Sequence, residues 1–265
     1  MKDYLDKTTG QTTFKVSQSP NIDYLIDEGN YEDALNAVNS LIEKEYTYEN
    51  LNLKGIILNK LERFDEAIEC FDNALNLKQS DEISLNRASA YYDWAKVTFF
   101  PTGNHDLALD LINNGLEALP ESEDPSEYYF LKAEILEGLN ELVEAQKAYL
   151  TAYKEFDKLH ELESQIEYLK STSDVLINIV GTGFYNFTPE PGNIIDLVRD
   201  EENEHDSDAI AVVFDGKSAG YVANNPYTLI DEVKSASDIK DMIGENQKAE
   251  ILFNYIGEYV IAKLI

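Results

Sequence analysis

Four segments in the first part of the chain share one pattern of small and large residues, which recurs at a nearly constant interval. Each segment carries an alanine close to its start, and successive alanines are separated by 33, 41 and 37 residues. The aligned residues are Ala34, Ala67, Ala108 and Ala145. A period of about 20 to 50 residues is typical of stacked repeats, in which each unit buries its apolar face against a neighbour. The interval therefore predicts an array of structural repeats.

Larger residues surround each alanine at helical spacing. A large residue lies three positions before it, except at His105, and another usually lies four positions after it. These residues are Tyr31, Phe64 and Leu142 before the alanine, and Val38, Phe71, Ile112 and Tyr149 after it. A second small residue follows at Ala74, Gly115 and Ala152. The pattern resembles the tetratricopeptide repeat (TPR) over roughly residues 20–157. This resemblance implies pairs of antiparallel helices that approach closely at the small residues.

Two segments depart from a regular array. The third unit carries an insertion, AKVTFFPTGNH, and it is the unit that keeps a terminal proline, Pro120. The segment KLHELESQIEYLKSTSD follows the fourth unit and is predicted to form a helix with a polar face. Terminal units of repeat arrays need a polar outer face, so we expect this helix to close the stack.

The hydrophobic pattern changes near residue 173, from helical spacing to β-branched runs with alternation. The runs that predict strands are VLINIVG, NIIDLV, AIAVVF, KAEILFNYI and YVIAKLI. We therefore predict an α+β chain with two domains. The predicted parts are a flexible tail at 1–19, an all-α TPR-like helical repeat domain with a capping helix at 20–173, and a β domain at 174–265.

The β domain resembles the HIRAN domain over almost all of residues 174–265. The matching features are the turn from Gly181 to Tyr185, the strand end Leu197-Val198-Arg199, Asn203 and Asp206, Ala209-Ile210, and Gly220-Tyr221-Val222 after a hairpin. The resemblance implies a small OB-like β-barrel with one or two short helices. In helicase-like members of that family the domain binds the free 3′ end of single-stranded DNA.

The resemblance places a nucleic-acid site on five residues, in which aromatic rings stack on bases and an aspartate accepts a hydrogen bond from the terminal hydroxyl. These residues are Phe184, Tyr185, His205, Asp206 and Tyr221. Three positions depart from the end-binding members. Gly183 stands where they have an arginine, Phe184 where they have a tyrosine, and His205 where they have another aromatic residue. The missing cation and the acids Glu201, Glu202 and Glu204 weaken the expected attraction for phosphate.

The acidic loop at 200–208 also has a purely structural interpretation. Asn203, Asp206 and Asp208 are residue types that bond nearby backbone amides and hold a connection between strands. The same loop superficially resembles a calcium-binding loop, but His205 replaces the glycine that such a loop needs and Ala211 replaces the closing glutamate. We therefore predict no metal site and no bound cofactor.

In the repeat domain, the first helix of each pair is expected to line a groove that binds a protein or peptide partner. Asparagine side chains there can donate to and accept from a peptide backbone. The predicted groove residues are Glu49, Asn52, Asn59, Asn86, Asp93, Phe130 and Glu134. Because Lys and Arg are scarce among them, a basic or neutral peptide fits better than an acidic one. The alternative is that the repeats serve only as a spacer.

Charge and composition restrict the function further. The chain has 21 Lys and Arg against 51 Asp and Glu, a net charge of −30. Such a charge repels phosphate backbones at long range, so general nucleic-acid coating is not expected. The single cysteine, Cys70, is predicted to be a buried packing residue. The first 20 residues lack the apolar core of a signal peptide, and a cytoplasmic location is expected.

No nucleophile elbow, phosphate-binding loop or metalloprotease motif occurs, so the chain is not expected to be an enzyme. The sequence instead predicts a non-catalytic adaptor. Its TPR-like repeats would bind a protein partner, and its HIRAN-like domain would recognise a 3′ single-stranded DNA end. The alternative is a scaffold for protein–protein interactions that binds no nucleic acid.

Overall fold

The computed structural model describes residues 20–257 and 259–265. The predicted tail at 1–19 lies outside these residues. Contacts divide the chain into two compact units, at 1–141 and 142–265. We call the first the repeat unit and the second the barrel unit, and describe each by itself.

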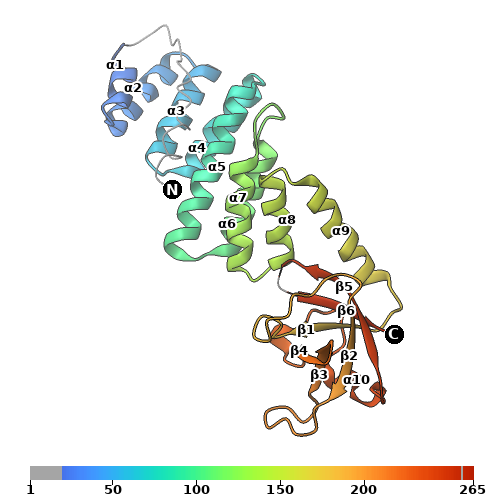
Figure 1. The fold of residues 1–265 in the computed structure, drawn as a ribbon. Helices are drawn as coiled ribbons and strands as arrows, with labels where there is room; N and C mark the ends of the chain where they lie inside the picture. The colour runs from blue at the N-terminus through green and yellow to red at the C-terminus, as the bar shows by residue number, and fades with distance from the viewer. Residues whose placement is uncertain (1–19, 258) are drawn as a thin grey trace. The chain divides into compact units, whose positions relative to one another are not determined.

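The repeat unit consists of helices that follow one another with short connections, and consecutive helices pack side by side (Figure 1). The helices are α1 (Pro20–Asp27), α2 (Tyr31–Lys44), α3 (Tyr48–Lys60), α4 (Phe64–Leu77), α5 (Asp81–Thr102), α6 (His105–Ala118) and α7 (Ser126–Gly138). Thr47 caps α3, because its side-chain oxygen accepts a hydrogen bond from the backbone N–H of Asn50 at 3.3 Å. Acidic residues occupy the first turn of these helices, where they complement the helix dipole.

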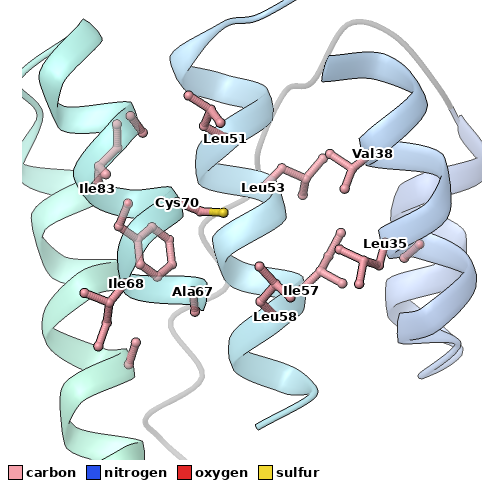
Figure 2. Close-up of a cluster of buried hydrophobic side chains, with 14 of the residues drawn as sticks. Leu35, Val38, Leu51, Leu53, Ile57, Leu58, Ala67, Ile68, Cys70 and Ile83 are labelled. Atoms are coloured by element: carbon pink, nitrogen blue, oxygen red, sulfur yellow. The ribbon is translucent and has the colours of Figure 1, made fainter. Parts of the chain in front are cut away.

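The apolar core of the repeat unit confirms the repeat pattern. Figure 2 shows side chains from α2, α3 and α4 directed into the space between these helices. The aligned alanines Ala34 and Ala67 are fully buried in this cluster, and Ala108 is fully buried in a second cluster. Cys70 is buried in the same cluster as Ala34 and Ala67, as predicted, and burial raises the pKa of its thiol. The small residues therefore occupy the places where helices approach most closely.

One close approach in this core lies between α3 and α4. A Cβ atom built on Gly55 would lie 2.6 Å from the nearest ring carbon of Phe71, whose side chain is only 1% exposed. Real Cβ contacts are essentially never shorter than 3.0 Å. Gly55 therefore allows the Phe71 ring to lie directly against the backbone of α3.

The insertion in the third unit lengthens a helix. α5 runs for 22 residues, through most of the inserted segment, and ends at Gly103. Gly103 adopts φ 63° and ψ 22°, a left-handed conformation that glycine reaches without strain and that ends many helices. The side chain of Asn104 then accepts a hydrogen bond from Leu107 N at 3.4 Å and caps α6.

The barrel unit contains two helices followed by a closed six-stranded barrel (Figure 1). Its main elements are α8 (Leu142–Ala152), α9 (Phe156–Ser171), β1 (Leu176–Val180), β2 (Ile194–Arg199), β3 (Ile210–Phe214), β4 (Lys217–Val222), α10 (Ala236–Ile239), β5 (Lys248–Tyr255) and β6 (Tyr259–Leu264). Short 3₁₀ turns lie at Pro226–Thr228 (η1) and Lys240–Met242 (η2). The strand order around the barrel is β1-β4-β3-β2-β5-β6, and every pair is antiparallel. The predicted β half is therefore a β-barrel with short helices.

The hairpin between β3 and β4 is closed by a two-residue turn. Phe214 pairs with Lys217 across a two-residue turn of Asp215 and Gly216. Both turn residues have positive φ, 49° and 73°, which is the conformation that an Asp-Gly turn favours. The sequence motif thus fixes the register of this hairpin.

Helices α8 and α9 belong to the barrel unit. Leu150, Leu162 and Leu169 from the two helices are buried in one cluster with residues of the barrel. The buried barrel residues of this cluster are Leu176, Val233, Tyr255 and Ile261. The sequence pattern grouped α9 with the repeats as a capping helix, because its secondary structure is helical. The domain boundary at residue 173 stays a prediction, and the packing of these leucines gives a reason to test it.

Candidate binding surfaces

Four of the seven predicted groove residues form two hydrogen-bonded pairs between α3 and α5. Asn86 Nδ2 donates to Asn52 Oδ1 at 3.0 Å, and Asn59 Nδ2 donates to Asp93 Oδ2 at 2.8 Å. The members of each pair are 34 residues apart in sequence, so equivalent positions of successive repeats are joined. This ladder aligns the first helices of two repeats along a common surface.

The two ends of the ladder differ in accessibility. Asn52 is 4% exposed and therefore supports Asn86, which is half-buried, rather than facing a partner itself. The Oδ1 atom of Asn59 is buried and has no hydrogen-bond partner among the described residues. A buried acceptor without a hydrogen bond lowers the stability of the fold by about 1–3 kcal/mol. A donor that reached this atom would therefore be stabilising.

Two tyrosines that the sequence analysis missed extend this surface toward α7. The rings of Tyr92, on α5, and Tyr128, on α7, are tilted by 58° with centroids 5.1 Å apart. Burial, and then the carboxylates of Glu127, Asp93 and Glu134, raise the pKa of Tyr92 to about 12. Tyr92 directly precedes the predicted groove residue Asp93, so its position near the groove could have been predicted from the sequence. Its contact with Tyr128 on another helix could not.

We call this surface the first-helix face and define it by Asn86, Tyr92, Asp93, Phe130 and Glu134, with Asn52 and Asn59 beneath. Phe130 is half-buried and Glu134 is exposed on α7. The remaining predicted residue, Glu49, is exposed in the first turn of α3, where Lys78 is the neighbouring charge. The structure therefore does not join Glu49 to the ladder.

Two cations of the first helices, Arg87 and Lys54, interact with groups of the second helix α4. The Arg87 guanidinium forms an ion pair with Asp72, on α4, at 2.7 Å. The positive charge of Lys54 favours the ionised forms of Glu66 and of the Cys70 thiol, and both of these residues are also on α4. In contrast, no ion pair within the described residues involves Asp93, Glu127 or Glu134. The electrostatic character of this face around Tyr92 is therefore negative.

On the barrel, three predicted aromatic residues lie together. Phe184 and Tyr185 follow Gly181 in a turn closed by a hydrogen bond from Phe184 N to Gly181 O at 3.0 Å. The Phe184 and Tyr185 rings meet edge to face with centroids 5.1 Å apart, and Tyr185 lies 6.2 Å from the Tyr221 ring. Phe184 is 83% exposed. We call these three residues the aromatic row.

Gly220 permits the third member of this row to reach its place. It has φ +151°, and a Cβ atom there would lie 2.6 Å from the backbone oxygen of Val180. Because only glycine avoids this contact, β4 can approach β1 and pair Tyr221 with Val180. Tyr221 also pairs with Ala211, and Ala211 with Val198, so the row continues across the barrel surface onto half-buried and exposed aliphatic residues.

A carboxylate holds the Tyr221 ring in place. Tyr221 Oη donates to Asp200 Oδ2 at 2.8 Å, and Asn203 Nδ2 donates to the same oxygen at 3.1 Å. The hydrogen bond to Asp200 raises the pKa of Tyr221 to about 12, and it holds the pKa of Asp200 below its ordinary value. Asp200 was not among the predicted site residues, although it directly follows β2 in the sequence.

The acidic loop is held by its own side chains. Asn203 Oδ1 accepts from the backbone N–H groups of His205 and Asp206 at 3.0 and 3.1 Å. Asp206 Oδ1 accepts from Asp208 N at 2.9 Å, and its Oδ2 accepts from Asn224 Nδ2 at 2.8 Å. The structural interpretation of Asn203 and Asp206 therefore holds. The His205 side chain is exposed on this loop.

The end of the loop is tied to the segment that carries α10. Asp208 accepts hydrogen bonds from Ser237 Oγ at 2.7 Å and from Lys240 Nζ at 2.8 Å. These bonds lower the pKa of Asp208. Within residues 20–257 and 259–265, no group of three or more His, Cys, Asp or Glu residues is placed to hold a metal ion. None of the described helices is long and apolar enough to cross a membrane.

The paired helices and their small-residue contacts define an α-helical repeat protein of the TPR class. The family model described as "Psidin, N-terminal TPR repeats region" matches residues 20–158, just over half of the chain, and the chain belongs to this family. The match does not include the strands of the barrel, whose resemblance to the HIRAN domain stays a prediction. No curated protein matches the sequence.

Two solved structures are similar to part of the chain, at low identity and low TM-score. "MamA RS-1 ArsTM double mutant" is 20% identical, covering 58% of this chain and 82% of that chain, with a TM-score of 0.36. "MamA 41-end from Desulfovibrio magneticus RS-1" is 19% identical, covering 55% of this chain and 92% of that chain, with a TM-score of 0.35. Since both TM-scores are low, the family assignment rests on the family model.

Proposed function

We propose that this chain is a non-catalytic adaptor whose first-helix face binds a peptide segment of a protein partner. The observation that carries the proposal is the ladder of Asn52 with Asn86 and of Asn59 with Asp93. Such a ladder fixes polar side chains at a regular spacing along successive repeats. An extended peptide presents backbone donors and acceptors that match a row of this kind.

The apolar part of the same face supplies the remaining binding energy. Tyr92 and Phe130 are half-buried, so each offers aromatic surface to a partner while its ring is held by neighbouring residues. Rigid aromatic anchors lose little conformational entropy on binding and often dominate interface energies. Membership of a TPR family is consistent with this role, because repeat arrays of this kind present extended binding surfaces.

Peptide selection on the full chain tests the adaptor proposal. Peptides are selected from an unbiased display library on the wild-type chain and then measured by fluorescence anisotropy. We expect the double variant Asn86→Ala with Phe130→Ala to weaken their binding about tenfold or more, because truncated interface anchors typically have effects of this size.

The matched control is Asn114→Ala with Leu77→Ala, which removes the same kinds of group from exposed positions on α6 and α4. This control is expected to bind like the wild type. Equal losses in both double variants, or no loss in either, would show that peptides do not use the first-helix face. The repeats would then be a spacer.

The barrel has a second candidate function, recognition of a single-stranded DNA end. The aromatic row favours it, because the Tyr185 ring contacts both Phe184 and Tyr221, and Phe184 is largely exposed. The resemblance to the HIRAN domain assigns the terminal hydroxyl to Asp206. Each oxygen of Asp206 already accepts one hydrogen bond from the loop, so any contact with a hydroxyl would use a remaining lone pair.

A gain-of-function substitution tests this candidate. A Cβ atom built on Gly183 would meet nothing within 4 Å, so Gly183→Arg introduces the family's cation at a position where the backbone has room for a side chain. If the barrel binds a 3′ end, we expect tighter binding and a salt dependence steeper by about 0.7 in log–log slope for one added phosphate contact to a single strand. The measurement is anisotropy with 3′-hydroxyl and 3′-phosphate oligonucleotides at several salt concentrations.

Phe184→Ala is the companion variant, since its exposed ring contributes little to folding. It is expected to weaken DNA binding by about 1–3 kcal/mol if the ring stacks on a base. If neither the wild-type chain nor the Gly183→Arg variant binds any oligonucleotide at low salt, the DNA-binding function is ruled out. The barrel would then belong to a scaffold that binds proteins alone.

A further inference from the structure

The negative charges around Tyr92 indicate which kind of peptide side chain would bind beside this ring. We propose that the peptide bound on the first-helix face presents a Lys or Arg side chain to the Tyr92 ring, beside Asp93 and Glu134. This inference rests on the proposed function, because it names the partner of the same surface.

The first argument is an excess of acceptors over donors. Asn59 Nδ2 donates to Asp93 Oδ2, so the two side chains lie together, and no described residue donates to the other oxygen of Asp93. Neither Asp93 nor Glu134 takes part in an ion pair with any described residue. A group that brings several N–H donors and a positive charge complements such a place, and Lys and Arg are the side chains that do so.

The second argument is the aromatic ring itself. Every charged group that acts on Tyr92, namely Glu127, Asp93 and Glu134, carries a negative charge, and together with burial these groups raise its pKa to about 12. Tyr92 therefore stays neutral at physiological pH, and its ring face can attract a cation within about 6 Å. A carboxylate next to the ring strengthens this attraction and repels acidic peptides.

The third argument is that no Lys or Arg among the described residues is found among the charged groups that act on Tyr92. Arg87 is engaged with Asp72, and Lys54 acts on groups of α4. The net charge of −30 also steers basic segments toward the chain in general, which makes charge alone an insufficient test. The experiment must therefore distinguish attraction by the carboxylates beside Tyr92 from attraction by the net charge of the whole chain.

Two variants with the same change in charge provide that separation. Asp93→Asn with Glu134→Gln removes the carboxylates beside Tyr92, and Asp110→Asn with Glu69→Gln removes two exposed carboxylates from α6 and α4. The unbiased peptide library is selected on the wild-type full chain and on both double variants. Peptides that depend on the first-helix face are identified by their loss of binding to Asn86→Ala with Phe130→Ala.

We expect these peptides to be enriched in Lys or Arg at one position on the wild type and on the Asp110/Glu69 variant, but not on the Asp93/Glu134 variant. Changing that Lys or Arg to Gln should weaken binding to the wild type about 2- to 5-fold or more, as a cation–π contact at an accessible site does. Tyr92→Leu should remove most of this difference while keeping the apolar volume.

Three results overturn the inference. Face-dependent peptides without Lys or Arg enrichment leave the adaptor function standing and refute the basic partner. Equal loss of enrichment on both charge variants shows attraction by the whole chain rather than by this place. Absence of any face-dependent peptide refutes the proposed function itself, and the inference with it.

Discussion

Phe71→Ala is expected to lower the free energy of unfolding of the repeat unit by about 3–5 kcal/mol, the usual cost of removing a fully buried phenylalanine. The ring is 1% exposed and lies against α3 at Gly55, so its removal leaves a cavity between α3 and α4 that the helices can fill only by moving together. Urea unfolding followed by circular dichroism measures the change. The control is Leu77→Ala on the same helix, whose side chain is 51% exposed and whose loss should cost much less.

The same contact predicts a coupled effect at Gly55. Alanine is favoured over glycine in a helix by about 1 kcal/mol. Overpacking lowers stability by about 1–3 kcal/mol. We expect this loss to exceed the gain in helix propensity, because the buried Phe71 ring cannot move aside. Gly55→Ala should therefore destabilise the wild type but be tolerated or stabilising in a Phe71→Leu background. Strictly additive effects of the two substitutions would show that the ring does not touch α3.

The second large effect concerns the boundary of the barrel. A fragment of residues 174–265 is expected to be less stable than one of residues 142–265 by about 4.5–9 kcal/mol, taking about 1.5–3 kcal/mol for each of three buried leucines. The shorter fragment lacks Leu150, Leu162 and Leu169, which cover apolar residues of the barrel. Since small domains have only about 5–15 kcal/mol of stability, it should be largely unfolded.

Thermal melts and near-ultraviolet circular dichroism of the two fragments decide this point. As a control, Leu162→Asp in the longer fragment should reproduce most of the loss, because it places an unpaired charge in the same cluster. If the 174–265 fragment folds as stably as the longer one, the boundary predicted at residue 173 is correct and α8 and α9 are not needed by the barrel.

The two surfaces differ in how far the sequence predicted them. Asn52, Asn59, Asn86 and Asp93 were placed on one face by alignment of the repeats, and the structure joins them in pairs between α3 and α5. Tyr92 and Tyr128 were missed, because their contact depends on how α5 meets α7, and no local pattern encodes that meeting. Which of these residues contact a partner remains a prediction.

On the barrel, the sequence analysis selected the aromatic residues that lie together but could not separate the two roles of the acidic loop. An aspartate in a loop bonds either its own backbone or a ligand, and both uses need the same residue type. The partners of Asp206 settle its structural role, since one is a backbone N–H nearby and the other is Asn224, eighteen residues further along the chain. Only a folded chain brings that second partner into reach.

By itself the sequence determined the local features of this protein, namely the helical repeats, the small residues at their contacts and most of the strands. Each follows from periodicity or from backbone preferences within a few residues. Tertiary structure alone decided that α9 packs with the barrel, that Asn52 is buried beneath Asn86, and that Gly220 lets Tyr221 reach the aromatic row. These features depend on surfaces that are far apart in the sequence, and side chains that suit one neighbour often suit another equally well.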